Sequence, residues 1–243
     1  MQRRMLIDAG NSGLKWAVVE DGQWHAQGRC DYADWSSLQA QLTTGIRCFI
    51  ASVTNAANET RLAALLEAAG IDSIWLKAEP AFKDLHNTYL NPQQLGVDRW
   101  MGLIGARQRT RGPALVVSVG TAMTADSLSA DGVFLGGVIV PGVTLMRQSL
   151  QQGTAQVAAA AGQWQAFPRA TADAVQSGIV AALCGAIQLQ YASLKEAAGT
   201  APRCLLTGGD AGVVLPHLAV PAEQVPALIL EGIDLVAREG ESK

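Results

Sequence analysis

The feature that most constrains the fold is a strand–turn–strand pattern that occurs twice. In the first copy the apolar segment Met5–Ile7 leads into a polar turn that begins at Asp8. In the second copy Ala114–Val117 leads into a turn that begins at Ser118, 110 residues later. The same offset aligns Gly10 with Gly120, Asn11 with Thr121, and the turn Asp21-Gly22 with Asp131-Gly132. Glycine and short polar residues recur at turns for backbone reasons, so the pattern predicts a duplicated strand–turn–strand unit.

Hydrophobic periodicity places further elements around the two copies. We expect strands at residues 15–20, 46–53, 134–141 and 203–207, and helices at 59–69, from 97 onward, at 171–194 and at 228–238. Thr171 is the expected N-cap of the third of these helices. The prediction is an α/β protein of two lobes, residues 1–112 and 113–243, with one polar turn from each lobe facing a shared cleft.

Composition excludes several classes of protein. The chain of 243 residues is 49% hydrophobic and 16% charged, with a formal net charge of −3. This balance supplies a core and argues against a nucleic-acid binder or an electrostatic membrane anchor. The four cysteines and three histidines have no zinc-site spacing, and the apolar run 178–189 is too short to span a bilayer. We expect reduced thiols and a cytoplasmic location, with no membrane or nucleic-acid partner.

The first turn has the composition of a phosphate-binding loop. Its glycines let the backbone approach a polyphosphate, Asn11 and Ser12 offer donors, and Lys15 adds a positive charge. Asp8, at the end of the strand, can hold a hydrated Mg²⁺. An ordinary hairpin turn has the same composition, so this motif alone leaves both interpretations open.

The second turn can hold the same nucleotide through the amides of Gly120 and Thr121 and the Thr121 hydroxyl. Two such turns at equivalent places in a repeat are better evidence than either alone. The turn Gly208-Gly209-Asp210 follows a third strand and can line the adenosine end, although a turn that merely enters a helix fits equally well.

A third constellation surrounds Asp98 and Arg99, which follow Gly96 where a helix begins. A carboxylate in this place can accept the proton of a substrate hydroxyl. The alternative is a structural one, with Asp98 favouring the helix dipole and Arg99 in an ion pair. Residue type alone does not separate the two.

Taken in order, these motifs resemble the type III pantothenate kinases, a family within the acetate and sugar kinase, heat-shock ATPase and actin superfamily. The resemblance covers nearly the whole chain, and its most specific pieces are Gly-x-Asp-Arg at 96–99 and Gly-Gly-x-Ile-x-Pro-Gly at 136–142. It implies a duplicated ribonuclease-H-like, actin-like ATPase fold and the phosphorylation of the primary hydroxyl of pantothenate by ATP, the first step toward coenzyme A.

The resemblance also assigns residues. ATP and Mg²⁺ are expected at the first turn and at one residue of the second: Asp8, Ala9, Gly10, Asn11, Ser12, Gly13, Leu14, Lys15 and Thr121. Pantothenate is expected at Tyr89, Gly96, Val97, Asp98, Arg99 and Thr171, with Asp98 as the general base. The family is dimeric, and the helix after Thr171, with its small residues, is the expected contact.

Two positions depart from the family pattern. Many members have Asp where this chain has Ser118, and that Asp binds a monovalent cation. Since a neutral hydroxyl attracts K⁺ or NH₄⁺ less strongly, a requirement for either ion is in doubt. Many members have Asn where this chain has Ala170, which leaves Thr171 itself in place.

Two other functions remain possible on the sequence. One is a kinase of the same superfamily that acts on another alcohol, such as a sugar. The other is a nucleotide-dependent regulatory protein. The presence of Asp8, Asp98, Arg99 and Thr121 favours catalysis, and the segment from Tyr89 to Arg99 favours pantothenate over a sugar.

Overall fold

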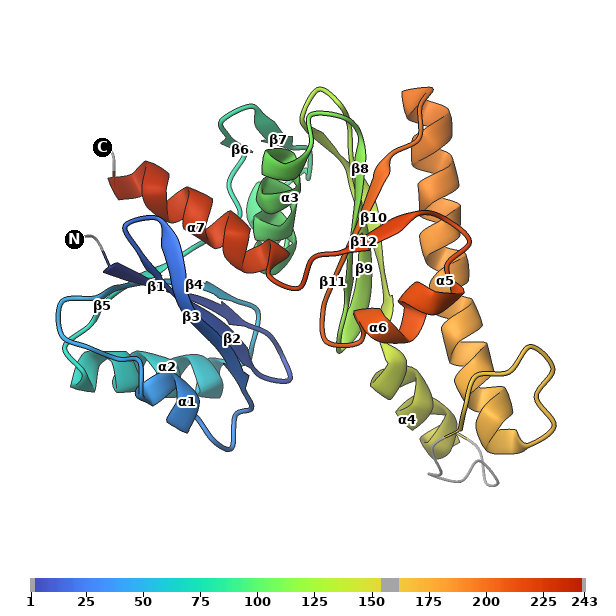
Figure 1. The fold of residues 1–243 in the computed structure, drawn as a ribbon, viewed down its shortest axis with the longest axis horizontal. Helices are drawn as coiled ribbons and strands as arrows, with labels where there is room; N and C mark the ends of the chain where they lie inside the picture. Colours follow the sequence, from blue (N-terminus) through green and yellow to red (C-terminus); the bar gives the residue numbers. More distant parts are fainter. Residues whose placement is uncertain (1–2, 154–161, 242–243) are drawn as a thin grey trace. The chain divides into compact units, whose positions relative to one another are not determined.

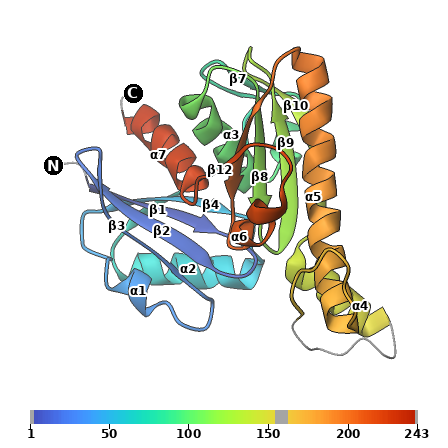
Figure 2. The ribbon, with the colours of Figure 1, turned by 45° about the vertical axis from the view of Figure 1, so that its right-hand side comes forward.

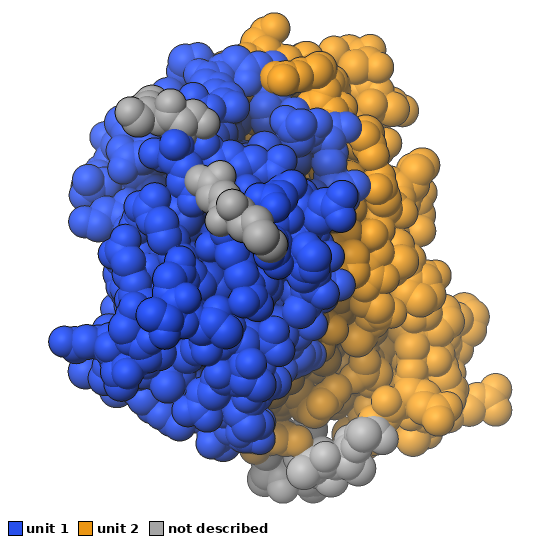
Figure 3. Space-filling view, turned by 60° about the vertical axis from the view of Figure 1, so that its left-hand side comes forward, with its two compact units in different colours: residues 1–109, 227–243 blue, residues 110–226 orange. Residues whose placement is uncertain are grey.

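The computed structural model describes residues 3–153 and 162–241. The chain forms two compact units: residues 1–109 together with 227–243, and residues 110–226 (Figure 3). Each unit has its own hydrophobic core, and each is described separately below.

Unit 1 contains a five-stranded sheet with the order β3-β2-β1-β4-β5 (Figure 1). Its strands are β1 (Arg3–Ala9), β2 (Leu14–Glu20), β3 (Gln23–Cys30), β4 (Arg47–Ser52) and β5 (Asp72–Trp75). The first three strands are antiparallel neighbours, whereas β4 is parallel to β1 and β5 to β4. The predicted turn at Asp21-Gly22 has φ values of 47° and 83°, as a two-residue hairpin turn requires.

Helices cover both faces of this sheet. They are α1 (Ser36–Gln39), α2 (Ala56–Ala68), α3 (Val97–Arg109) and α7 (Leu228–Glu241). Alternation along β1 decides which residues meet which helices, because successive side chains of a strand point to opposite faces. Met5 and Ile7 belong to the core formed with α1 and α2. Arg4 instead pairs with Asp234 of α7 (Nε–Oδ1 2.9 Å), so the even-numbered residues of β1 face α3 and α7.

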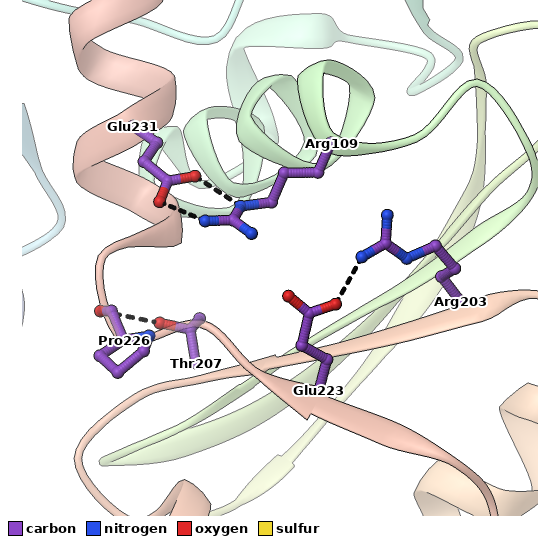
Figure 4. Close-up of polar contacts among 6 residues, drawn as sticks. All are labelled: Arg109, Arg203, Thr207, Glu223, Pro226 and Glu231. Atoms are coloured by element: carbon purple, nitrogen blue, oxygen red, sulfur yellow. Dashed lines mark hydrogen bonds and ion pairs between the residues drawn. The ribbon is translucent and has the colours of Figure 1, made fainter.

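A short segment of unit 1 leads into α3. It contains β6 (Ala81–Phe82), β7 (Leu85–Asn87) and the 3-10 helix η1 (Pro92–Gln94). The far end of α3 is joined to α7 by Arg109, whose guanidinium donates to both carboxylate oxygens of Glu231 at 2.7 Å (Figure 4).

Unit 2 repeats the arrangement of unit 1. Its strands are β8 (Ala114–Val119), β9 (Ala122–Leu128), β10 (Val133–Pro141), β11 (Arg203–Thr207) and β12 (Ala222–Gln224). They follow the order β10-β9-β8-β11-β12, with β11 parallel to β8 and β12 parallel to β11. The ion pair Arg203–Glu223 joins β11 to β12 (Figure 4). Because the equivalent strands have the same order and directions in both units, the predicted duplication is confirmed.

The helices of unit 2 are α4 (Val143–Gly153), α5 (Thr171–Ala198) and α6 (Ala211–Val214), followed by the 3-10 helix η2 (Leu215–His217) (Figure 2). The expected N-cap of α5 is wrong by one residue, since Ala170 occupies that position and makes no side-chain capping bond. The helix also runs four residues past Leu194 and ends at Gly199, whose φ of 65° suits a helix C-terminus.

The length and composition of α5 correct a second expectation. By these two measures alone, this helix of 28 residues could cross a membrane. Its buried side chains, which include Leu183 and Ile187, form the core of unit 2 with strands β8 and β9. One face of α5 therefore lies in the core of unit 2, while the most apolar stretch of the helix is only 33% buried.

The observed units differ in one respect from the expected lobes. The first expected boundary, at residue 112, lies close to the observed one at 109, but residues 227–243 cluster with the first unit rather than the second. The reason is the packing of α7 against α3 and β1. The assignment of 1–112 and 113–243 as domains stays a prediction.

Candidate active site

Asp8 is the first residue of the site in unit 1. It lies on β1 directly across from Lys15 on β2, and its side chain is buried. Burial raises the pKa of Asp8 from 3.8 to about 7; Lys15 opposes this change, and the nearby carboxylate of Asp98 adds to it. Asp8, Lys15 and Asp98 therefore form one electrostatic group.

The first loop joins β1 to β2. It is closed by a hydrogen bond from the Gly10 amide to the Gly13 carbonyl (3.0 Å), which leaves Asn11 and Ser12 exposed at its tip. The exposed tip thus lies at the same end of β1 as Asp8. A ligand that reaches this tip meets polar groups and the Lys15 charge together.

Asp98 lies in the first turn of α3 and is half-buried. Burial raises its pKa, whereas hydrogen bonds from the amides of Arg99 and of Asp98 itself, together with the Arg99 charge, lower it. A Cβ added at Gly96 would lie 2.6 Å from Asp98 Oδ1. A side chain at 96 would therefore push the Asp98 carboxylate aside, because that carboxylate folds back over the residue.

Tyr89 and Arg99 form a second polar group beside Asp98. The Arg99 guanidinium donates to the Tyr89 hydroxyl at 3.0 Å and lies 5.7 Å from the centre of its ring. The segment that carries Tyr89 is fixed by Asn87, which is buried: its amide donates to the Pro92 carbonyl (3.1 Å), and its oxygen accepts from the Tyr89 amide (3.1 Å). Asn87 therefore determines the path of the chain between β7 and α3.

The second loop, at Gly120 and Thr121 between β8 and β9, is contacted by two other segments of unit 2. The Gly142 amide donates to the Thr121 carbonyl at 2.9 Å. A Cβ at position 142 would lie only 1.9 Å from the Gly120 carbonyl oxygen, so only glycine fits there. The turn after β11 also reaches this loop, because the Asp210 amide donates to the Val119 carbonyl at 3.0 Å. Ser118, which is half-buried, is the next-to-last residue of β8 and pairs with Thr124 of β9.

Thr171 lies elsewhere in unit 2, exposed at the start of α5. It lines a largely apolar groove of about 480 Å³ together with residues of α4 and α5. The groove residues are Met146, Ser149, Leu150, Thr171, Ala174, Val175, Gly178 and Ile179.

The expected site residues thus fall into two groups, and Thr171, in the groove beside α4 and α5, belongs to neither. Unit 1 brings together Asp8, the first loop, Lys15 and Asp98, with Tyr89 and Arg99 nearby. Unit 2 brings the second loop together with Gly142 and with the turn that contains Asp210.

One contact of the first loop was not expected. Tyr32, in the turn after β3, donates its hydroxyl hydrogen to the Gly10 carbonyl. No motif or spacing in the sequence indicates this contact, which depends on the path of β3.

The charged groups also bear on metal binding. Within residues 3–153 and 162–241, no cluster of three or more His, Cys, Asp or Glu side chains could hold a metal ion. Two carboxylates whose pKa values are raised do fit Mg²⁺, which commonly binds one or two carboxylates and takes its remaining ligands from phosphate and water. The donor set suits a metal that arrives with its nucleotide.

Solved structures with the same fold include distant proteins. One from Campylobacter jejuni, named as a conserved Baf family transcriptional activator, has a TM-score of 0.64 at 22% identity; the match covers 98% of this chain and all of that one. MreB5 of Spiroplasma citri bound to ADP has a TM-score of 0.50 at 10% identity, with 99% and 98% covered. Identities this low show the fold alone, which is the predicted duplicated α/β fold of the actin-like ATPases.

Sequence relatives are much closer. A type III pantothenate kinase of Thiobacillus denitrificans is 63% identical over 98% of this chain and 97% of its own length. A second, from Aromatoleum aromaticum, is 40% identical over 97% of this chain and 98% of its own length. The family model described as type III pantothenate kinase matches residues 4–193, which include both loops, Asp98 and Thr171. The chain therefore belongs to the type III pantothenate kinase family.

Proposed function

We propose that this chain transfers the terminal phosphoryl group of ATP to the primary hydroxyl of pantothenate, with Asp98 as the general base. The observation that carries the proposal is the placement of two carboxylates in unit 1: Asp8 is buried at the loop end of β1, and Asp98 lies in the first turn of α3, near enough for its charge to act on Asp8. It supports a site where a substrate hydroxyl and the metal-bound phosphates meet. Relatives named as type III pantothenate kinases match almost the full length of the chain, which supports the choice of substrate.

ATP is proposed to bind residues 8–15 and Thr121. Asn11 and Ser12 are exposed, and the backbone amides of such a turn suit phosphate oxygens, whose charge Lys15 offsets. Mg²⁺ would be held by Asp8, and when bound it neutralises charge on the phosphates. Asp8 must lose its proton to bind the metal, and the metal itself favours that loss.

Pantothenate is proposed to bind Tyr89, Gly96, Val97, Asp98, Arg99 and Thr171. Arg99 offers a fixed guanidinium because Tyr89 already holds it on one side. Such a group suits the carboxylate of pantothenate, since arginine binds carboxylates through paired hydrogen bonds. Asp98 would then accept the hydroxyl proton, and burial supports this role by bringing its pKa closer to neutral pH.

A homodimer is part of the proposal. The exposed face of α5 carries a row of small residues that ends in a leucine: Gly178, Ala181, Ala182, Gly185 and Leu189. Leu189 is 66% exposed. Small side chains let two helices approach closely, and apolar ones gain from burial, so this face suits the same helix of a second copy.

Two finer points belong to the same proposal. Ser118 places a neutral hydroxyl at the position proposed for a monovalent cation, so we expect K⁺ or NH₄⁺ to stimulate the enzyme weakly or not at all. We also propose a cytoplasmic location, where ATP and reduced thiols are available; the four cysteines are free.

The deciding experiment measures ADP release by the purified protein with Mg²⁺-ATP. Pantothenate is compared with several sugars, each with and without K⁺. Turnover with pantothenate alone among the acceptors is expected. Turnover with a sugar and not with pantothenate would replace the proposed substrate, and nucleotide binding without any turnover would favour a regulatory protein.

A further inference from the structure

The starting observation is the contact of Tyr32 with the first loop. Its hydroxyl donates to the carbonyl oxygen of Gly10 at 2.5 Å. Burial raises the pKa of Tyr32, so the hydroxyl keeps the proton that it donates. The Gly10 carbonyl therefore has a fixed partner on the β3 side of the loop.

A chain of hydrogen bonds leads to this hydroxyl from α2. The side-chain amide of Asn58 donates to Thr54 Oγ1 at 3.0 Å. A hydrogen bond with the Thr54 side chain in turn lowers the pKa of Tyr32, against the larger effect of burial. Because a hydroxyl has one hydrogen to donate, the bonds run in one direction: from Asn58 to Thr54, then to Tyr32, then to Gly10. Bonds that run in one direction polarise and strengthen one another.

The position of Tyr32 is itself held firmly. Its carbonyl accepts a hydrogen bond from Arg61, and its ring meets that of Trp35 edge to face, with 6.1 Å between their centres. The Arg61 guanidinium lies 4.2 Å from the centre of the Trp35 ring, and Trp35 is buried. The Asp31 carboxylate accepts from the amides of Ala33 and Asp34, which fixes the turn. Tyr32 is thus held by its carbonyl, by its ring and by the turn that carries it.

The orientation of one peptide group follows from this contact. No peptide bond in the described chain is cis. In a trans peptide the C=O and N–H bonds point in opposite directions. With the Gly10 carbonyl held toward Tyr32, the amide of Asn11 in the same peptide points away from it. Asn11 is exposed, so that amide is open to a ligand.

We propose that Tyr32 is a positioning residue for the nucleotide: it orients the Gly10–Asn11 peptide so that its N–H, and not its carbonyl oxygen, faces the phosphates. The inference rests on the proposed function of the first loop. Because glycine permits many backbone angles, the Gly10–Asn11 peptide could otherwise adopt either orientation. A flipped peptide would present an oxygen to phosphate oxygens and repel them.

The test is Tyr32→Phe in the full-length protein, which removes the hydroxyl and keeps the ring that packs on Trp35. We expect KM for ATP, and the Kd of ATP measured by calorimetry, to rise roughly 3- to 10-fold, which corresponds to one net hydrogen bond. KM for pantothenate should stay within about twofold, because only the nucleotide meets this peptide. Unchanged Kd and KM for ATP would overturn the proposal.

If Tyr32→Phe folds poorly, the variant Thr54→Val tests the proposed role of Tyr32 instead. Thr54→Val leaves Tyr32 able to bond Gly10 but removes the hydroxyl that polarises it, so we expect a smaller rise in the Kd of ATP. The double variant should match Tyr32→Phe alone, since Thr54 acts through Tyr32. Effects that multiply would show that the two residues act separately and would overturn the proposed chain.

The matched control is Tyr191→Phe, which removes a hydroxyl from a buried tyrosine of α5 in unit 2. It should leave the Kd of ATP unchanged; a rise equal to that of Tyr32→Phe would mean that the effect is general and would count against the proposal. Failure of the proposed function gives a different result, namely a wild-type protein that does not phosphorylate pantothenate. The Kd of ATP then still tests Tyr32 by itself.

Discussion

The carboxyl group of Asp8, on β1, is buried near that of Asp98, on α3: burial raises the pKa of Asp8 most, Lys15 opposes the rise, and the Asp98 charge adds to it. The two residues come from separate elements of unit 1, and both lose hydration there. Two negative charges so placed repel each other unless a cation or a proton intervenes. The folded protein therefore holds this pair at a cost in stability that a bound metal would relieve.

Replacing Asp8 by Asn should stabilise the free protein at high pH. The folded pKa of Asp8, about 7, lies above the 3.8 of an exposed carboxyl, so above pH 7 the folded state carries a buried charge that the unfolded chain keeps in water. This penalty fades as the pH falls from 7 to 4, because the folded state takes up the proton first. The gain at pH 8 is at most about 4 kcal/mol.

Denaturant unfolding without nucleotide at pH 8, 6 and 4 measures this difference. Asp72→Asn, at an exposed site paired with Arg47, is the control and should change the free energy of unfolding by less than about 0.5 kcal/mol. Equal stabilities of the Asp8→Asn variant and wild type at all three pH values would contradict the prediction. The same variant should bind Mg²⁺-ATP more weakly at pH 8, since it lacks the proposed metal ligand.

Asp98→Asn should abolish most turnover while nucleotide binding survives. Loss of a general base lowers kcat by about 10²- to 10⁴-fold, and the amide occupies nearly the same space beside Gly96. Steady-state kinetics with pantothenate, together with the Kd of ATP, separates the two effects. Asp131→Asn, in an exposed hairpin turn, is the control for charge. An Asp98→Asn enzyme with wild-type kcat would exclude Asp98 as the base.

Gly142→Ala should disrupt the second loop. The new Cβ would lie 1.9 Å from the Gly120 carbonyl oxygen and 2.8 Å from that of Thr121, so the backbone of the loop must move. We expect a loss of about 1–3 kcal/mol in the free energy of unfolding and a higher KM for ATP. Gly212→Ala, where nothing lies within 4 Å of the added atom, should change neither quantity. A Gly142→Ala protein with normal stability and kinetics would show that the loop adapts freely.

Ala182→Glu should separate the proposed dimer. Position 182 is exposed on α5 among other small residues, and a charged side chain there would have to be buried against a second copy. Light scattering after size exclusion should give the mass of a dimer for the wild type and of a monomer for the variant. Ala57→Glu, at an exposed position of α2, should leave the dimer intact. A monomeric wild type would refute the proposed contact.

Local chemistry made much of the fold predictable. The turn at Asp21-Gly22 and the strand Arg203–Thr207 were expected where they occur, because positive φ and a bounded apolar run leave clear marks in a sequence. Helix α2 begins three residues before the expected Glu59, after Asn55, whose side chain caps it. A polar cap some residues before the apolar pattern is easily missed, which explains the shifted boundary.

Contacts between residues far apart in the chain could not be predicted from the sequence. Residues 228–238 were expected to be helical, yet nothing local indicates that this helix packs with α3 and β1 in the first unit. Likewise the composition of the first loop suggested a phosphate site, but the contact of Tyr32 with Gly10 depends on how β3 leads into the next turn. Both features join residues far apart in the chain, and such pairs leave no periodic signal.

The return of α7 to unit 1 also sets an order of events during synthesis. Arg4 emerges early from the ribosome, whereas its partners Asp234 and Glu241 are among the last residues made. Unit 2 has all its strands and helices by residue 226. The first half of the duplication is therefore completed only by the last helix of the chain, which is made after every described strand and helix of the second half.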